Sequence, residues 1–198
     1  PRLVGLDPFD LQALTRAVYR QVGGDEDTGA PYPPQGDKQR ASVLAAFEVA
    51  MLDLQGQVTD RPLYQLLGGA VRPDVNYSAY LFYKYARHHE DPGYPTDDWG
   101  EALTPAQLVD QARRMVDGYG FDSIKLKAGV FAPEEEIEGL RALRRAFPHH
   151  PLRIDPNGGW SVETTRRVMP ALSEPGLLEY LEDPVPTLED MAEVATFA

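Results

Sequence analysis

Residues 122–130 have the sequence DSIKLKAGV, and this stretch decides the fold that we expect for the rest of the chain. Successive side chains of a β-strand point to opposite faces, so Ile124 and Leu126 would face a core together. Lys125 and Lys127 would then share the other face, where two ammonium groups repel each other unless an anion or a catalytic task compensates. The stretch therefore predicts a strand with one buried face and one functional face.

Two later stretches, RIDPNG and YLEDP, also place ionisable side chains where an apolar run ends. Asp155 ends the first run and Glu182 the second, and a proline follows closely in both, which stops a strand and begins a loop. Together with Lys127, the two acids lie at nearly even intervals, with helical patterns between them. Strands and helices that alternate at this length build a parallel sheet.

The periodicity of apolar residues supplies the other elements. Helices are expected at residues 8–22, 40–57, 104–120, 133–147 and 161–173, and strands at 75–83, 121–127, 151–155 and 177–182. Thr104 and Pro105 predict the start of the third of these helices, as N-cap and first helical residue. Residues 84–103 show no clear period and are expected to form a long surface loop, and a second loop is expected at 23–39.

No glycine-rich phosphate motif follows any expected strand, which disfavours the doubly wound nucleotide-binding folds. A (β/α) barrel fits better, and the chain would supply about half of its strands. We therefore expect an α/β protein in two parts. Residues 1–72 would form a mostly helical N-terminal part, and residues 73–198 the first half of the barrel.

Composition limits the classes of partner. The net charge of −12 and the lack of a basic stripe argue against nucleic acid. Without cysteine the chain can form neither disulfides nor thiolate metal sites. No apolar run is long enough to span a membrane and no signal peptide is evident, so we expect a soluble cytoplasmic protein. The chain begins at Pro1 and stops within a helical pattern, so we expect a fragment of a longer protein.

Catalytic groups of a barrel lie at the carboxyl ends of its strands, where Lys127, Asp155 and Glu182 are expected. The two carboxylates suit a hard cation such as Mg²⁺, which would draw a substrate carboxylate toward Lys125 and Lys127. Repulsion between the lysines and proximity to the cation would lower a lysine pKa and make a base. A single K-x-K or D-P is more often a solvated face or a turn, but three such features on successive strands favour a function.

These residues resemble the enolase superfamily, specifically its acid-sugar dehydratase branch of the glucarate type. The matching stretches, in order, are FEVAMLDLQGQ with LYQLLGG, YLFY, YGFDSIKLKAG, RIDPNGGW and YLEDP, between roughly residues 40 and 190. The resemblance implies a (β/α) barrel of the enolase-superfamily type, preceded by helices of an α+β capping domain. It also implies Mg²⁺-dependent removal of the proton α to a carboxylate, an enediolate, and loss of water to give a 2-keto-3-deoxy acid.

Roles follow by motif position. The resemblance implies that Lys127 is the general base, and that Lys125 tunes its pKa and contacts the substrate carboxylate. Asp155 and Glu182 would be metal ligands. Substrate contacts are implied at Tyr80 of YLFY, at Lys125, and at Asn157 of DPNG. The third metal ligand and a His–Asp pair would lie on later strands, so this chain alone would be inactive and the full-length protein would be the carbon–oxygen lyase.

Three alternatives stay open at this point. One keeps the metal and the lysine base but ends in racemisation or epimerisation. Another is an aldolase that forms a Schiff base at Lys127. The third is a barrel without catalysis that serves binding or assembly. YPPQGDKQ, before the second helix, offers no threonine where glucarate enzymes use one, so the acid sugar stays open too. A homo-oligomer with a small-molecule substrate, and no nucleic-acid or membrane partner, is expected.

Overall fold

The structure is a computed structural model that describes residues 3–23, 38–88, 93 and 95–198. It divides into two compact units, residues 1–74 and 75–198. Most of the loop expected at residues 23–39 lies outside the described residues. The division into a capping part and a barrel part made from the sequence stays a prediction, and each unit is described here by itself.

The first unit is helical, as expected. Helix α1 (Leu11–Gly23) lies against α2 (Lys38–Thr59), and α1 contributes the buried side chains Leu14 and Val18. Helix α3 (Leu63–Leu66) is a single turn, and the Gly69 N–H closes it by donating to the Tyr64 carbonyl at 2.8 Å. Several apolar side chains of α2 remain exposed in this unit, among them Val43, Phe47 and Leu54.

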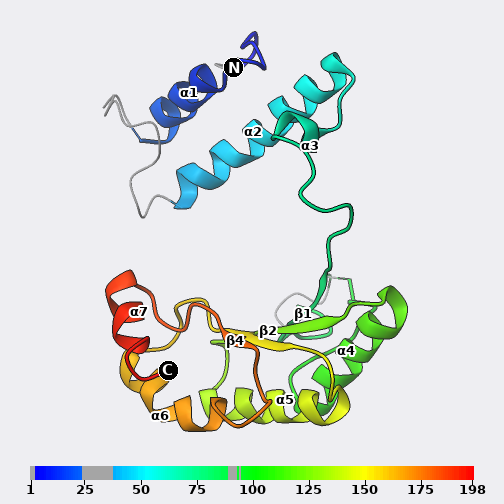
Figure 1. Cartoon of the computed structure of the whole chain (residues 1–198), viewed down its shortest axis with the longest axis vertical. Coiled ribbons are helices and arrows are strands. Elements are labelled where there is room, and N and C mark those ends of the chain that lie inside the picture. The colour runs from blue at the N-terminus through cyan, green and yellow to red at the C-terminus, as the bar shows by residue number, and fades with distance from the viewer. Residues whose placement is uncertain (1–2, 24–37, 89–92, 94) are drawn as a thin grey trace. The chain divides into compact units, whose positions relative to one another are not determined.

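The second unit alternates strands and helices along the chain (Figure 1). The strands are β1 (Ser78–Phe82), β2 (Ser123–Lys127), β3 (Leu152–Asp155) and β4 (Tyr180–Leu181). The helices are α4 (Pro105–Tyr119), α5 (Pro133–Ala146), α6 (Val162–Leu172) and α7 (Leu188–Val194). All four strands are parallel and pair in chain order, β1-β2-β3-β4.

Helices α4, α5 and α6 lie along one face of this sheet (Figure 1). A doubly wound fold carries helices on both faces and reverses its strand order, whereas a barrel keeps the order and places its helices outside. The arrangement is that of a partial (β/α) barrel, so the predicted fold class is confirmed.

The alternation predicted for β2 is confirmed. Ile124 and Leu126 are fully buried in the core under the helices, together with Leu140 of α5. Lys125 and Lys127 lie on the opposite face of the strand, with 18% and 20% of their side chains exposed. The same five-residue strand thus supplies both the core and the candidate site.

The predicted start of α4 is also confirmed. The Thr104 hydroxyl accepts a hydrogen bond from the Gln107 N–H at 3.3 Å, and the Gln107 side chain accepts one from the Thr104 N–H at 3.0 Å. This reciprocal capping box satisfies two N–H groups that the helix itself cannot. No helix within the described residues is long and apolar enough to cross a membrane.

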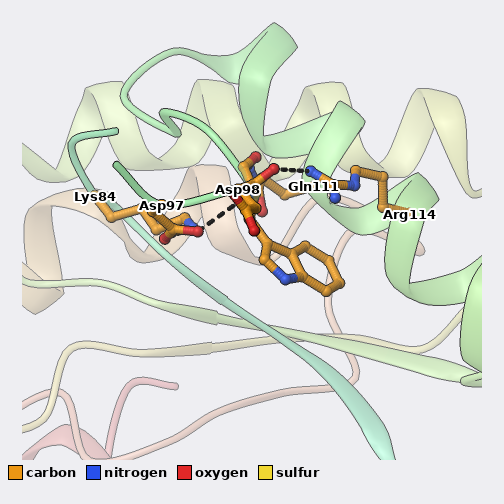
Figure 2. Close-up of polar contacts among 6 residues, drawn as sticks. Lys84, Asp97, Asp98, Gln111 and Arg114 are labelled. Atoms are coloured by element: carbon orange, nitrogen blue, oxygen red, sulfur yellow. Dashed lines mark hydrogen bonds and ion pairs between the residues drawn. The ribbon is translucent and has the colours of Figure 1, made fainter. Parts of the chain in front are cut away.

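The segment after β1 is more ordered, in its described part, than its lack of periodicity suggested. Its two ends pair, because Lys84 forms an antiparallel bridge with Ala102. The Lys84 ammonium also pairs with the Asp97 carboxylate, which accepts the Trp99 N–H at 2.8 Å (Figure 2). Residues 95–102 therefore return along a fixed path to the end of β1.

Helix α4 holds this returning segment in place. Figure 2 shows Gln111 and Arg114 of α4 reaching toward it. Gln111 donates to the Trp99 carbonyl, and Arg114 donates to the Asp98 carbonyl at 3.2 Å. The Arg114 guanidinium also lies 4.4 Å from the centroid of the Trp99 ring, a cation–π contact that adds to the hydrogen bonds.

Candidate active site

Four charged side chains from three adjacent strands meet at the carboxyl end of the sheet. Lys127 Nζ donates to Asp155 Oδ2 at 2.6 Å, and Lys125 Nζ lies 2.8 Å from the same oxygen. Lys125 Nζ lies 2.7 Å from Glu182 Oε1 as well. The lysines and acids that the sequence placed at three strand ends are therefore in direct contact.

Asp155 is the centre of this cluster, and only 3% of its side chain is exposed. Burial alone would raise the pKa of its carboxyl group. Hydrogen bonds from Lys125 and Lys127, and a third from the Asn157 N–H to Oδ1 at 2.8 Å, outweigh burial and hold the pKa below its usual range. The group is a carboxylate near neutral pH, with both oxygens occupied.

Lys125 contacts both acids of the cluster. Its burial lowers the pKa, but hydrogen bonds to Asp155 and Glu182 raise it further, so the net pKa lies above the usual lysine value. The expectation of a lowered lysine pKa concerned the base, Lys127, and stays a prediction, whereas this structure favours the ammonium form of Lys125. The reason is that the Asp155 carboxylate bonds both ammonium groups and neutralises their repulsion.

The two remaining candidate residues border the cluster in different ways. Tyr80 of β1 lies opposite Lys125 in the strand register, and its ring centroid is 5.4 Å from Lys125 Nζ. Asn157 touches the cluster through its backbone N–H, in the left-handed conformation with a φ of 55°. Asparagine tolerates this conformation better than most residues, which suits it to the turn that follows β3.

Backbone contacts fix the strand ends relative to one another. The Ala128 N–H donates to the Asp155 carbonyl at 2.9 Å, which joins the loop after β2 to the end of β3. The Gly158 N–H donates to the Asp183 carbonyl at 2.7 Å, which joins the loops after β3 and β4. At Gly129 an added Cβ would lie 2.6 Å from the Pro156 oxygen, so only glycine fits this approach.

Sequence reasoning missed one aromatic residue at the site. Phe82 lies opposite Lys127 in the register and its ring centroid is 4.5 Å from that of Tyr80. The signal was present, because Phe82 follows Tyr80 by two positions on a strand and must share its face.

A buried glutamate was missed as well. Glu136, in the first turns of α5, is fully buried and its carboxylate accepts backbone N–H groups of the loop after β2. No sequence signal distinguishes it, because it is the last of three consecutive glutamates and its burial depends on the phase of the helix.

The donor chemistry of the cluster fits part of a magnesium site. One oxygen of Asp155 and one of Glu182 approach the same cationic nitrogen, at 2.8 Å and 2.7 Å, so both carboxylates can reach a common cation. Carboxylate oxygens are the ligands that Mg²⁺ prefers. Across the described part of the chain, no three His, Asp or Glu side chains group closely enough to hold a metal by themselves.

Family models match both parts of the chain. Residues 107–198 match the model described as enolase C-terminal domain-like. Residues 1–68 match that of the N-terminal domain of mandelate racemase and muconate lactonizing enzyme.

Comparison with individual proteins and solved structures indicates the same family. The chain is 53% identical to a probable glucarate dehydratase of Streptomyces coelicolor, over 98% of this chain and 46% of the relative. It is 50% identical to an enolase of Pseudomonas fluorescens crystallised with magnesium, potassium and tartrate, with a TM-score of 0.81 over 98% of this chain and 46% of that one. For an enolase of Mycobacterium smegmatis complexed with tartrate, the identity is 52% and the TM-score 0.77, over 98% and 45% of the two chains. The chain thus spans about half the length of these relatives.

Proposed function

This chain belongs to the enolase superfamily, and from that premise we propose that its full-length protein is a Mg²⁺-dependent dehydratase of an acid sugar. The reaction is of the glucarate type. A proton α to a carboxylate is removed, the β-hydroxyl group leaves as water, and a 2-keto-3-deoxy acid results. The enzyme is accordingly a carbon–oxygen lyase.

One observation carries the proposal. A single oxygen, Asp155 Oδ2, lies within hydrogen-bond distance of both lysine ammonium groups, and Glu182 completes the cluster. Removal of a carbon-bound proton needs a base next to groups that stabilise the resulting negative charge. Two amines and two acids in contact at one end of a parallel sheet supply both requirements.

Mg²⁺ would be held by Asp155 and Glu182, with further ligands from parts of the protein beyond this chain. When bound, the ion would stabilise the negative charge that develops on the substrate carboxylate as the α-proton leaves. The enolases of Pseudomonas fluorescens and Mycobacterium smegmatis support this assignment, since the first was crystallised with magnesium and both with tartrate, a hydroxylated dicarboxylate.

Lys127 is the general base in this proposal, and it takes the α-proton on Nζ. The base must lose its own proton first. In the proposed working state the Asp155 oxygen faces the cation instead of the lysines, and the positive charge of Lys125 then favours the neutral form of Lys127. Lys125 stays protonated and bonds the substrate carboxylate.

Tyr80 and Asn157 complete the proposed substrate contacts. The Tyr80 ring, 39% exposed beside Lys125, offers a face and a hydroxyl group to a polyhydroxylated chain. The Asn157 amide lies in the turn that follows Asp155, where it can bond a substrate hydroxyl group.

The first test is activity of the full-length protein. Incubation with glucarate and other aldarates or aldonates, with Mg²⁺ and then with EDTA, should give a 2-keto-3-deoxy product only when the metal is present. Absence of product from every acid sugar would refute the dehydratase assignment. Deuterium exchange at the α-carbon without dehydration would instead indicate a racemase or epimerase, and an EDTA-resistant adduct trapped by borohydride would indicate an aldolase.

Variants then separate the base from the metal ligands. Lys127→Ala should lower kcat by about 10²- to 10⁴-fold, the usual contribution of a general base, and leave Mg²⁺ affinity intact. Asp155→Asn should weaken Mg²⁺ binding by more than about tenfold, since changes even in the groups that orient ligands cost that much. Asp183→Asn, one residue from Glu182 and exposed, is the matched control and should change neither. Equal Mg²⁺ affinity in Lys127→Ala and Asp155→Asn would contradict these roles.

A further inference from the structure

Glu136 is a fully buried carboxylate that the proposed reaction does not use. It lies on α5, whose N-cap residue, Ala132, has no side chain able to bond the helix start. The Glu136 side chain turns back over this first part of the helix. A negative charge there is favoured by the helix dipole, which is positive at the N-terminus.

The carboxylate binds three successive N–H groups of the loop after β2. Oε2 accepts the Gly129 N–H at 3.1 Å, and Oε1 accepts those of Val130 and Phe131 at 2.9 Å and 3.0 Å. The loop begins at the residue after Lys127, the proposed base. The Glu136 side chain therefore fixes the backbone that directly follows Lys127.

The loop after β2 also contacts the end of β3. Gly129 packs so closely against Pro156, which follows Asp155, that a Cβ would not fit between them. Just before it, the Ala128 N–H bonds the Asp155 carbonyl at 2.9 Å. The position of this loop thus bears on the proposed base and on its neighbour Asp155 together.

We infer that Glu136 is a positioning residue, which fixes Lys127 against Asp155 by anchoring the backbone of residues 129–131. The inference rests on the proposed function for the role of Lys127. A base displaced by about an ångström costs on the order of 10²-fold in rate, so a loosened loop should be visible in kcat. Mg²⁺ binding should change less than kcat, because the loop contacts Asp155 at its backbone carbonyl group and not at the carboxylate that would hold the ion.

Glu136→Gln is the informative substitution, because it keeps the size of the side chain. A carboxamide replaces one acceptor oxygen by a donor, so in either orientation at least one N–H of residues 129–131 loses its acceptor. Glu135→Gln is the matched control for charge, since this neighbour on the same helix is exposed. Thr165→Ala is the control for stability, because that buried hydroxyl group bonds the Ser161 carbonyl at 2.9 Å, within α6 and its cap.

Two measurements on the full-length protein decide the matter. In Glu136→Gln, amide hydrogen exchange at residues 129–131 should accelerate by about tenfold or more. Its kcat should fall by about tenfold or more, with the dissociation constant for Mg²⁺ alone changed less than about threefold. Both controls should retain wild-type exchange at residues 129–131 and kcat within about threefold of the wild type.

Unchanged exchange at residues 129–131 would overturn the inference, and so would a loss of kcat no larger than in Thr165→Ala. If Glu136→Gln does not fold, Glu136→Asp carries the same measurements, because it keeps the charge and shortens the reach. If the wild-type protein removes no α-proton, the proposed function fails on its own. The exchange rates alone then decide whether Glu136 anchors the loop.

Discussion

Gly129→Ala tests the tight approach between the loop after β2 and the loop after β3. Gly129 has a φ of +80°, in the left-handed region, and its Cα faces the Pro156 carbonyl oxygen. Alanine there costs about 1–2 kcal/mol for the left-handed conformation. The added Cβ would lie 2.6 Å from that oxygen, and relieving such an overlap costs a further 1–3 kcal/mol or so. The total loss of unfolding free energy is then about 2–5 kcal/mol.

Gly120→Ala is the matched control. Gly120 ends α4 with a φ of +70°, but an added Cβ would meet nothing within 4 Å. Gly120→Ala should lower the free energy of unfolding by about 1–2 kcal/mol only, which is the cost of the left-handed conformation. The difference between the two variants therefore isolates the contact with Pro156.

Urea denaturation of the full-length protein, followed by circular dichroism, measures both variants against the wild type. Gly129→Ala should be the less stable by about 1–3 kcal/mol. It should also lose more dehydratase activity, because the clash separates the ends of β2 and β3. Equal stability of the two alanine variants would refute the reasoning, since the contact with Pro156 would then contribute nothing.

Two further predictions concern the segment after β1 and the helix that follows it. Thr104→Ala removes the side-chain acceptor for the Gln107 N–H and should cost about 0.5–2 kcal/mol in urea denaturation. Thr104→Ser keeps the acceptor and should stay close to the wild type, so a loss as large as in Thr104→Ala would contradict the capping role. The hydrogen bond from Lys84 lowers the pKa of Asp97. The pair therefore stabilises the fold at pH values above the usual aspartate pKa, and this contribution is lost as the pH falls through the lowered pKa. Asp97→Asn should therefore flatten the fall in stability between neutral and acidic pH, and a curve parallel to that of the wild type would argue against the pair.

Much of the fold followed from the sequence, because its signals are local. The alternation of Ile124, Lys125, Leu126 and Lys127 needs only the geometry of a strand, and the even intervals between strand ends need only repeated strand–helix units. The start of α4 needed only Thr104 and its neighbours. The convergence at the strand ends followed as well, since parallel strands in chain order bring their carboxyl ends together.

The rest depends on distances that no local pattern contains. The raised pKa of Lys125 arises because Asp155 and Glu182 both lie within hydrogen-bond distance of its ammonium group, which is a property of the assembled sheet. Which of three adjacent glutamates turns inward at Glu136 depends on where α5 begins against the sheet. The order in the segment after β1 comes from Arg114 of α4, many residues away.

The double use of strand β2 has a consequence for how such a protein can diverge. Gain or loss of one residue inside the strand would turn the lysines into the core and the apolar side chains outward, so folding and chemistry would fail in the same event. Substitutions in β2 can therefore be accepted during evolution, whereas a change in its length cannot. Insertions and deletions are instead tolerated in connections such as the segment between β1 and α4. New substrate preferences can arise there without a change in the strands.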